Sequence, residues 1–418
     1  MSTKIKFQLS FMMFLEFFIW GGWFVTLGIY LPSTLGASGG ETALAYSSQS
    51  WGAIIAPFII GLIADRYFNA EKILGILHLI GAFLMYQMAN ADTMAAFVPF
   101  VFAYMIAYMP TLALVNSVSF NQMKDPSKEF AFVRVFGTLG WIIAGLIFIS
   151  AIFQWDSPEN ITNGALRNTF LMTAIASLVL GLFSFTLPKT PPKVGKGEKV
   201  TLSDLLGLEA LKLLKIKNFL IFFIASILIC IPLGFYYQHA GQFLGEIEAS
   251  ITLFGNEIGP AGMMTIGQAS EVLFMLLLPY FFTKFGFKKT IMAGMLAWTI
   301  RYLLFAYGDA GEMAFMLLIG IALHGICYDF FFVSGQIYTD TKAGPKYKSA
   351  AQGLITLATY GVGMLIGFWV AGQITDANII SENQHNWMNI WRFPAFFALG
   401  VAILFMIFFK NENVSYKQ

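Results

Sequence analysis

The chain has 418 residues, of which 57% are hydrophobic, 17% aromatic and only 11% charged, with a formal net charge of +2. Soluble domains carry about 25% charged residues, so this composition excludes an ordinary soluble protein and predicts a membrane protein. The small net charge is spread over short loops, which argues against nucleic acid as a partner.

Long apolar runs predict membrane-spanning helices, because a helix needs roughly 20 mainly apolar residues to cross the hydrocarbon core of a bilayer. The pattern predicts twelve spans and therefore an all-α membrane protein. In chain order the spans cover 9–31, 43–64, 71–90, 95–121, 131–153, 166–187, 217–243, 259–283, 288–307, 312–338, 347–374 and 388–409.

The distribution of Lys and Arg predicts how the chain is oriented in the membrane. If twelve spans alternate, nearly all of these residues fall on one side, together with both termini. The loops on the opposite side contain no Lys or Arg; they are 32–42, 91–94, 154–165, 244–258, 308–311 and 375–387. Since basic loops stay on the inner side, both termini are predicted to be cytoplasmic.

A polar stretch divides the spans into two groups of six. We expect an N-terminal six-helix bundle over 1–187, a cytoplasmic linker over 188–216 and a C-terminal six-helix bundle over 217–418. The linker opens with Pro and Gly residues, and its second part has the pattern of an amphipathic helix on the inner membrane surface. Two six-helix halves around a central path are common in secondary transporters, which work as monomers within the lipid bilayer.

Two carboxylic acids interrupt apolar spans. Glu271 lies in the eighth span and Asp329 in the tenth, and an acid at membrane depth indicates an ion or solute pathway. Gln268 precedes Glu271 by one helical turn, so the two side chains share a face and are suited to two neighbouring hydroxyl groups. Because desolvation disfavours the charged carboxylate, Glu271 or Asp329 is expected to bind the proton that drives transport. The alternative is a structural carboxylate neutralised by Arg134 or Arg301.

Other polar residues in the spans rank below these two acids. Glu16 in the first span is a third candidate for proton coupling. Arg301 is expected near the outer end of the ninth span, where it reaches water or pairs. The histidines are expected to be hydrogen-bonded packing residues, and His239 and His324 merit a test because their helices carry other polar groups.

The loop after the second span contains Gly61-Leu-Ile-Ala-Asp65-Arg66. Asp65 and Arg66 are candidates for a gating role in the inner loops, and a simple topology signal is the alternative. This stretch resembles the front of the signature loop of the major facilitator superfamily. The expected later Gly and basic residues are replaced by Phe68, Asn69 and Ala70.

Within that superfamily, the chain resembles the bacterial nucleoside:proton symporters, the nucleoside permeases, over nearly its whole length. Seven blocks in the right order carry the resemblance. They are Phe18-Ile-Trp20-Gly-Gly-Trp23, Ala107-Tyr-Met-Pro110-Thr111-Leu-Ala-Leu-Val-Asn116, Val133-Arg134-Val-Phe-Gly137-Thr138-Leu-Gly140, Leu205-Leu-Gly-Leu-Glu-Ala, Gln268-Ala-Ser270-Glu271-Val-Leu-Phe, Arg301-Tyr-Leu-Leu-Phe-Ala-Tyr-Gly308-Asp309 and Tyr328-Asp329-Phe-Phe.

The resemblance implies the major facilitator fold and a set of substrate contacts. It implies that Gln268, Glu271 and Asp329 hold the ribose and base of a nucleoside in a central cavity. Tyr328 matches an aromatic residue beside the site. The fifth helix contributes polar and aromatic positions, which match Arg134, Thr138 and Trp141.

The chain departs from this family pattern on the seventh helix. On an ungapped comparison, the family's amide pair is replaced by Gly234 and Tyr237, with Gln238 and Gln242 nearby. Tyr237 is an additional candidate surface for stacking on the base.

The resulting hypothesis is nucleoside import by proton symport and alternating access across a bacterial inner membrane. A proton-coupled facilitator for a sugar or another hydroxylated solute is the alternative. A membrane-embedded enzyme is disfavoured, because the sequence contains neither H-E-x-x-H nor G-x-S-x-G nor clustered metal ligands. The absence of a G-x-x-x-x-G-K-[ST] loop argues against ATP as energy source, and no cofactor or metal is expected.

Overall fold

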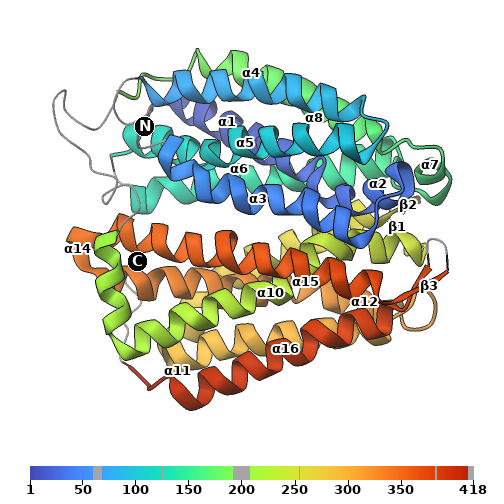
Figure 1. The fold of residues 1–418 in the computed structure, drawn as a ribbon. Helices are drawn as coiled ribbons and strands as arrows, with labels where there is room; N and C mark the ends of the chain where they lie inside the picture. The colour runs from blue at the N-terminus through green and yellow to red at the C-terminus, as the bar shows by residue number, and fades with distance from the viewer. Residues whose placement is uncertain (60–67, 125, 192–207, 254, 382–383, 413–418) are drawn as a thin grey trace. The chain divides into compact units, whose positions relative to one another are not determined.

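Helices make up most of the computed structural model (Figure 1). It describes residues 1–59, 68–124, 126–191, 208–253, 255–381 and 384–412.

The chain divides into two compact units. Unit 1 contains Met1–Lys199 and Ile251–Thr265, and unit 2 contains Val200–Ser250 and Ile266–Gln418. The predicted gating residues Asp65 and Arg66 lie outside the described residues, so their role stays a prediction.

Unit 1 contains α-helices, one π-helix and one β-hairpin. Its elements are α1 (Thr3–Gly21), α2 (Phe24–Leu35), α3 (Gly39–Ile59), α4 (Ala70–Ala89), α5 (Met94–Gln122), α6 (Pro126–Ile142), the π-helix η2 (Ile143–Ile152), α7 (Pro158–Thr162), α8 (Arg167–Ser184), β1 (Ile251–Leu253) and β2 (Asn256–Ile258).

Small residues bring the helices of unit 1 close together. In this unit α1 packs against α6, and α4 packs against α5 and α8. A Cβ atom on Gly140 would collide with the carbonyl oxygen of Phe14, and one on Gly21 would lie 2.7 Å from Cγ of Trp141. Glycine at such contacts lets two helix backbones approach, as is common between membrane helices. The contact holds α6, with its candidate site residues, against α1.

Unit 2 contains the remaining elements together with all but the first residues of α11. They are the 3₁₀-helix η3 (Leu208–Lys215), α10 (Lys217–Glu246), α11 (Pro260–Tyr307), α12 (Ala314–Ala322), α13 (His324–Tyr328), the π-helix η4 (Asp329–Val333), α14 (Ser334–Thr356), the π-helix η5 (Leu357–Gly363), α15 (Met364–Asp376), β3 (Ile379–Ser381), β4 (Gln384–His385) and α16 (Trp387–Phe408).

The helix α11 contains two of the predicted spans. Its 48 residues include both 259–283 and 288–307 apart from Gly259, and the backbone leaves helical geometry at Gly286 with φ 77° and ψ 167°. Positive φ is readily adopted by glycine, which lacks a Cβ atom. A kink at one glycine therefore stands where the sequence predicted a loop.

Every one of the twelve predicted spans overlaps a helix. Among the described residues, ten helices are long and apolar enough to cross a membrane. The difference has two sources: α11 counts once although it covers two predicted spans, and α3 is not among the ten. The description of α3 ends at Ile59, before the end of the predicted second span at residue 64.

The linker region is described only in part. Residues 208–215 form the 3₁₀-helix η3, where the sequence predicted an amphipathic helix. Ala210 and Leu213 of η3 are buried, and η3 packs against α10 and α14. The placement of this segment on the inner membrane surface stays a prediction.

Candidate functional site

Glu271 and His324 are the centre of a polar cluster in unit 2. Glu271 lies on α11 and His324 begins α13, with Oε2 of the carboxylate 4.0 Å from Nε2 of the imidazole. On the other side of the ring, Nη1 of Arg301 lies 3.1 Å from Nδ1 of His324. The imidazole therefore stands between a carboxylate and a guanidinium group.

These contacts determine the tautomer of His324. A guanidinium group has only donors, so Arg301 donates and Nδ1 of His324 accepts. In a neutral imidazole the other nitrogen then carries the hydrogen, and Nε2–H points toward Glu271. The cluster places a donor beside the carboxylate without adding a charge.

Arg301 is fully buried, so of the two expected alternatives it does not reach water but contacts another side chain, His324. Its guanidinium carbon lies 3.4 Å from the ring centroid of Tyr236, and the same ring stacks on His324 with centroids 5.4 Å apart. A cation over an aromatic face is stabilised by the ring quadrupole, most strongly where water is excluded. Arg301 is held inside unit 2 by this stack and by its hydrogen bond to His324.

Close approach of α13 to α11 holds His324 beside Glu271. The backbone N–H of Gly325 donates to Oγ of Ser270 over 3.1 Å, and a Cβ atom on Gly325 would lie 2.6 Å from the carbonyl carbon of Ser270. A Cβ on Gly267 would lie 3.1 Å from Cβ of His324. The sequence analysis missed the role of these two glycines, although Gly267 precedes Gln268 and Gly325 follows His324.

Gln268 and Asp329 carry buried polar atoms that have no hydrogen-bond partner among the described residues. These atoms are Oε1 of Gln268 and both carboxylate oxygens of Asp329. Asp329 is fully buried and begins the π-helix η4, and π-helical turns are frequent at functional sites. Buried polar groups are normally hydrogen-bonded, so these atoms are suited to a bound ligand.

Aromatic residues surround the same part of unit 2. The Tyr328 ring lies 5.7 Å from the His324 ring, and its hydroxyl oxygen lies 2.5 Å from that of Tyr360 on η5. Tyr237 is on α10, next to Tyr236. The sequence analysis missed Tyr360, because no local pattern distinguishes it from the other tyrosines of the chain.

Packing explains why Gly234 stands where the family pattern has an amide residue on the seventh helix. A Cβ atom on Gly234 of α10 would lie 2.8 Å from the carbonyl carbon of Gly367 on α15. The backbones of these helices approach too closely for an amide side chain at this position. Gln242 is engaged elsewhere, since its Oε1 lies 3.0 Å from Nδ1 of His239.

His239 is a structural residue. Besides the contact with Gln242, its Nε2 lies 2.8 Å from Oγ1 of Thr375. Both ring nitrogens are therefore used in hydrogen bonds within unit 2, as expected for a packing histidine.

The other predicted site residues lie on α6 of unit 1. The guanidinium carbon of Arg134 lies 4.2 Å from the Phe17 ring centroid, and Nη1 of Arg134 has no hydrogen-bond partner in the described part of the chain. Trp141 meets Trp20 edge to face at 5.7 Å. Thr138 lies between them, one turn after Arg134. Arg134, Thr138 and Trp141 are thus on one helix of unit 1, and the third candidate Glu16 is on α1 of the same unit, while Glu271 and Asp329 are in unit 2.

No three His, Cys, Asp or Glu side chains gather as metal ligands in the residues that the structure describes. The described polar clusters are instead built from single acids with histidine, arginine and hydroxyl groups.

The chain is similar to known proteins over nearly its full length. The model of the family described as Nucleoside H+ symporter matches residues 1–414. YegT of Escherichia coli (strain K12) is 42% identical over 421 residues, with 98% of this chain and 95% of YegT covered. The xanthosine permease of the same strain is 32% identical over 417 residues, covering 98% of this chain and 97% of the permease. The crystal structure of the nucleoside transporter NupG covers 98% of this chain and all of that chain, with 30% identity and a TM-score of 0.84.

Proposed function

Because this chain belongs to the family of nucleoside H+ symporters, we propose that the cluster around Glu271 binds both the nucleoside and the coupling proton. The protein has the major facilitator fold, and it is a multi-pass membrane transporter that moves nucleosides together with protons. It is not an enzyme. The match of the family over residues 1–414 is the observation that carries this function.

Gln268 and Glu271 are the proposed contacts of the ribose. They lie one turn apart on α11, and the buried Oε1 of Gln268 has no hydrogen-bond partner among the described residues. Two neighbouring sugar hydroxyls match this spacing, and a site built to hydrogen-bond hydroxyls rejects analogues that lack them. Asp329 is the proposed third polar contact.

Aromatic side chains are the proposed contacts of the base. Tyr328 and Tyr237 offer flat surfaces in unit 2, which suits a pocket with apolar walls and few polar anchors. Arg134, Thr138 and Trp141 stay predicted substrate contacts from unit 1.

Proton binding at Glu271 would change its hydrogen bonding. The ionised carboxylate faces Nε2–H of His324 at 4.0 Å, an electrostatic contact longer than a hydrogen bond. The protonated acid becomes a donor, which it can direct to a sugar oxygen. Proton binding and nucleoside binding then both favour the protonated side chain of Glu271, so each increases the affinity for the other. Asp329 is the second proposed carrier of the proton.

The test is uptake of labelled uridine or adenosine into proteoliposomes with an imposed pH gradient. We expect Glu271→Gln or Asp329→Asn to abolish gradient-driven accumulation while keeping nucleoside exchange, because exchange needs no net proton movement. Glu246→Gln is the matched control, since Glu246 also binds a histidine, His385, with Oε2 to Nδ1 2.7 Å. Undiminished accumulation in both site variants would refute the proposed site.

The orientation and environment of the transporter belong to the proposal as well. The distribution of Lys and Arg supports cytoplasmic termini and import across a bacterial inner membrane. Two six-helix bundles over 1–187 and 217–418, joined by the linker 188–216, and a monomer in the lipid bilayer complete the proposed organisation.

A further inference from the structure

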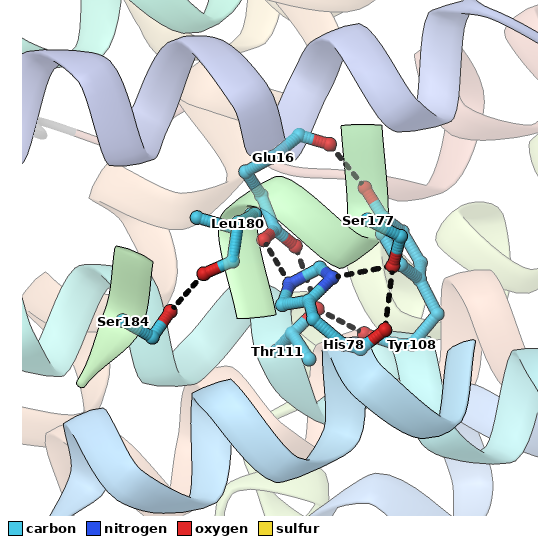
Figure 2. A network of polar contacts seen from close by, with 7 residues as sticks. All are labelled: Glu16, His78, Tyr108, Thr111, Ser177, Leu180 and Ser184. Carbon is cyan, nitrogen blue, oxygen red and sulfur yellow. Dashed lines mark hydrogen bonds and ion pairs between the residues drawn. The ribbon is translucent and has the colours of Figure 1, made fainter. Parts of the chain in front are cut away.

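Unit 1 contains a buried acid–histidine pair (Figure 2). Oε2 of Glu16 on α1 lies 2.8 Å from Nε2 of His78 on α4, and both side chains are almost completely buried. Oγ1 of Thr111 on α5 lies 2.6 Å from Oε1 of Glu16 and 2.5 Å from the carbonyl oxygen of Tyr108, so its single hydrogen is shared between these two acceptors. Ser177 on α8 contacts Nδ1 of His78 at 3.2 Å. Four helices of unit 1 meet at this network.

The hydrogen bonds of Ser177 determine one proton of the imidazole. Oγ of Ser177 donates to the backbone carbonyl oxygen of His78 over 2.9 Å. A hydroxyl has a single hydrogen, so toward Nδ1 of His78 this oxygen can only accept. Nδ1 of His78 therefore carries a hydrogen.

The contact between Glu16 and His78 needs a second proton. With a hydrogen on Nδ1, a neutral imidazole has only a lone pair on Nε2, and an ionised carboxylate has only lone pairs. Two lone pairs facing each other at 2.8 Å would repel. One proton must lie between the two atoms, whether it is assigned to an imidazolium or to a carboxylic acid.

We propose that Glu16 and His78 form a second proton-binding site of the transporter, with one exchangeable proton shared between Oε2 and Nε2. With this proton the pair has no net charge, and without it the pair carries one negative charge. The site is separate from the one proposed at Glu271 and does not depend on it. A net charge inside a membrane span is costly, so the two protonation states differ strongly in energy.

Among the described residues, titratable groups lie on several of the elements packed against α1 and α4. On α5, Tyr108 donates from its hydroxyl to the carbonyl oxygen of Glu16 over 2.7 Å, and Tyr104 stacks on Tyr108 with centroids 5.5 Å apart. On α6, Arg134 lies over the ring of Phe17. Charged residues at the ends of these packed helices include Lys4, Lys6, Glu71, Lys72, Glu129 and Arg167. The tyrosine of α2, Tyr30, packs on Phe97 and Phe170.

Arg134 gives this site a connection to transport. Phe17, whose ring carries the Arg134 guanidinium at 4.2 Å, is the next residue after Glu16. Loss of the shared proton would place a negative charge one residue from that contact. The protonation of Glu16 and His78 therefore changes the charge close to a predicted substrate residue.

Histidine nuclear magnetic resonance tests the site directly. The chain has four histidines, so protein labelled with ¹⁵N-histidine and placed in lipid nanodiscs gives four rings, and His78→Gln assigns one of them. We expect the Nδ1 signal of His78 to stay protonated and its Nε2 signal to change as the pH is raised and the shared proton leaves. Glu16→Gln has no carboxylate with which Nε2 can share a proton, so the change of the Nε2 signal with pH should differ from that of the wild type.

Two further variants separate this proposal from a structural hydrogen bond. Glu246→Gln should alter His385 and leave His78 unchanged, since Glu246 binds His385. If Glu16→Gln fails to fold, Thr111→Val removes the hydroxyl beside Oε1 of Glu16 but keeps the carboxylate, and the change of the His78 Nε2 signal with pH should again differ from that of the wild type. A His78 ring that stays in one state over the whole pH range of the folded protein, or titrates identically in these variants, overturns the proposal.

Discussion

Arg301 donates a hydrogen bond from Nη1 to Nδ1 of His324 over 3.1 Å, and this contact turns Nε2 of the same ring toward Glu271. A buried cation thus sets the orientation and tautomer of the imidazole beside the proposed proton carrier. The planar guanidinium is suited to this task, because it donates at the edge while its face rests on Tyr236 at 3.4 Å.

Arg301→Lys should impair nucleoside uptake although it keeps the positive charge. An ammonium group lacks the planar face, and a desolvated cation–π contact contributes about 2 kcal/mol. We therefore expect about a tenfold or larger fall in uptake rate, measured in proteoliposomes, since about 1.4 kcal/mol is a factor of ten. Arg392→Lys is the control: Arg392 donates to the hydroxyl of Tyr307 over 2.9 Å and belongs to no proposed site. Equal rates in both variants would contradict a special role for Arg301.

His324→Gln and His324→Asn should separate the two functions of this ring. A glutamine amide reaches the level of Nε2 and can donate toward Glu271, whereas an asparagine oxygen stays at the level of Nδ1 and can accept from Arg301. If the donor beside Glu271 serves coupling, the glutamine variant retains more pH-driven accumulation than the asparagine variant. His239→Gln controls for loss of a buried histidine. The opposite order would show that the Arg301 contact matters more.

Gly234→Asn, which restores an amide on the seventh helix, should destabilise the protein. Any Cβ atom there lies 2.8 Å from Gly367, and overpacking typically costs about 1–3 kcal/mol. Thermal unfolding of the purified protein measures the loss. Gly400→Ala on α16 is the matched control, since no atom lies within 4 Å of its added Cβ; it should be neutral or stabilising by roughly 0.5–1 kcal/mol. A stable Gly234→Asn protein would disprove the packing explanation.

Asp156 should make the stability of the protein depend on pH. This buried carboxyl accepts hydrogen bonds from Oγ of Ser150 over 2.6 Å and from the N–H of Ala261 over 2.9 Å, and burial raises its pKa above the ordinary value. The folded state then holds the proton more firmly than the unfolded state. The resulting stabilisation is complete below the unfolded pKa of about 3.9 and is lost as pH rises through the raised pKa.

Asp156→Asn cannot ionise and lacks this dependence. As pH rises from acid to neutral, the unfolding temperature of the wild type should therefore fall relative to that of Asp156→Asn. A difference that is constant, or that shifts in favour of the wild type, would contradict the raised pKa.

Much of the fold could be predicted because membrane insertion depends on local composition. Every predicted span overlaps a helix, and the disagreement at 284–287 arises because a single glycine, Gly286, makes the turn. Gln268 and Glu271 could be selected because polar groups are conspicuous in an apolar run. The residues that support the site could not be selected, since Tyr360, which contacts Tyr328, and Gly325, which contacts Ser270, look like ordinary residues of their segments.

The sequence by itself determined the membrane class, the helical spans, the family and the acids that stand out in them, because each depends on residues that are neighbours along the chain. Only the tertiary structure decided that Arg301 is buried, that His324 lies beside Glu271 and that Glu16 meets His78. Glu16 and His78 are 62 positions apart, and a proton can be shared only where helix packing brings two such atoms within hydrogen-bond distance.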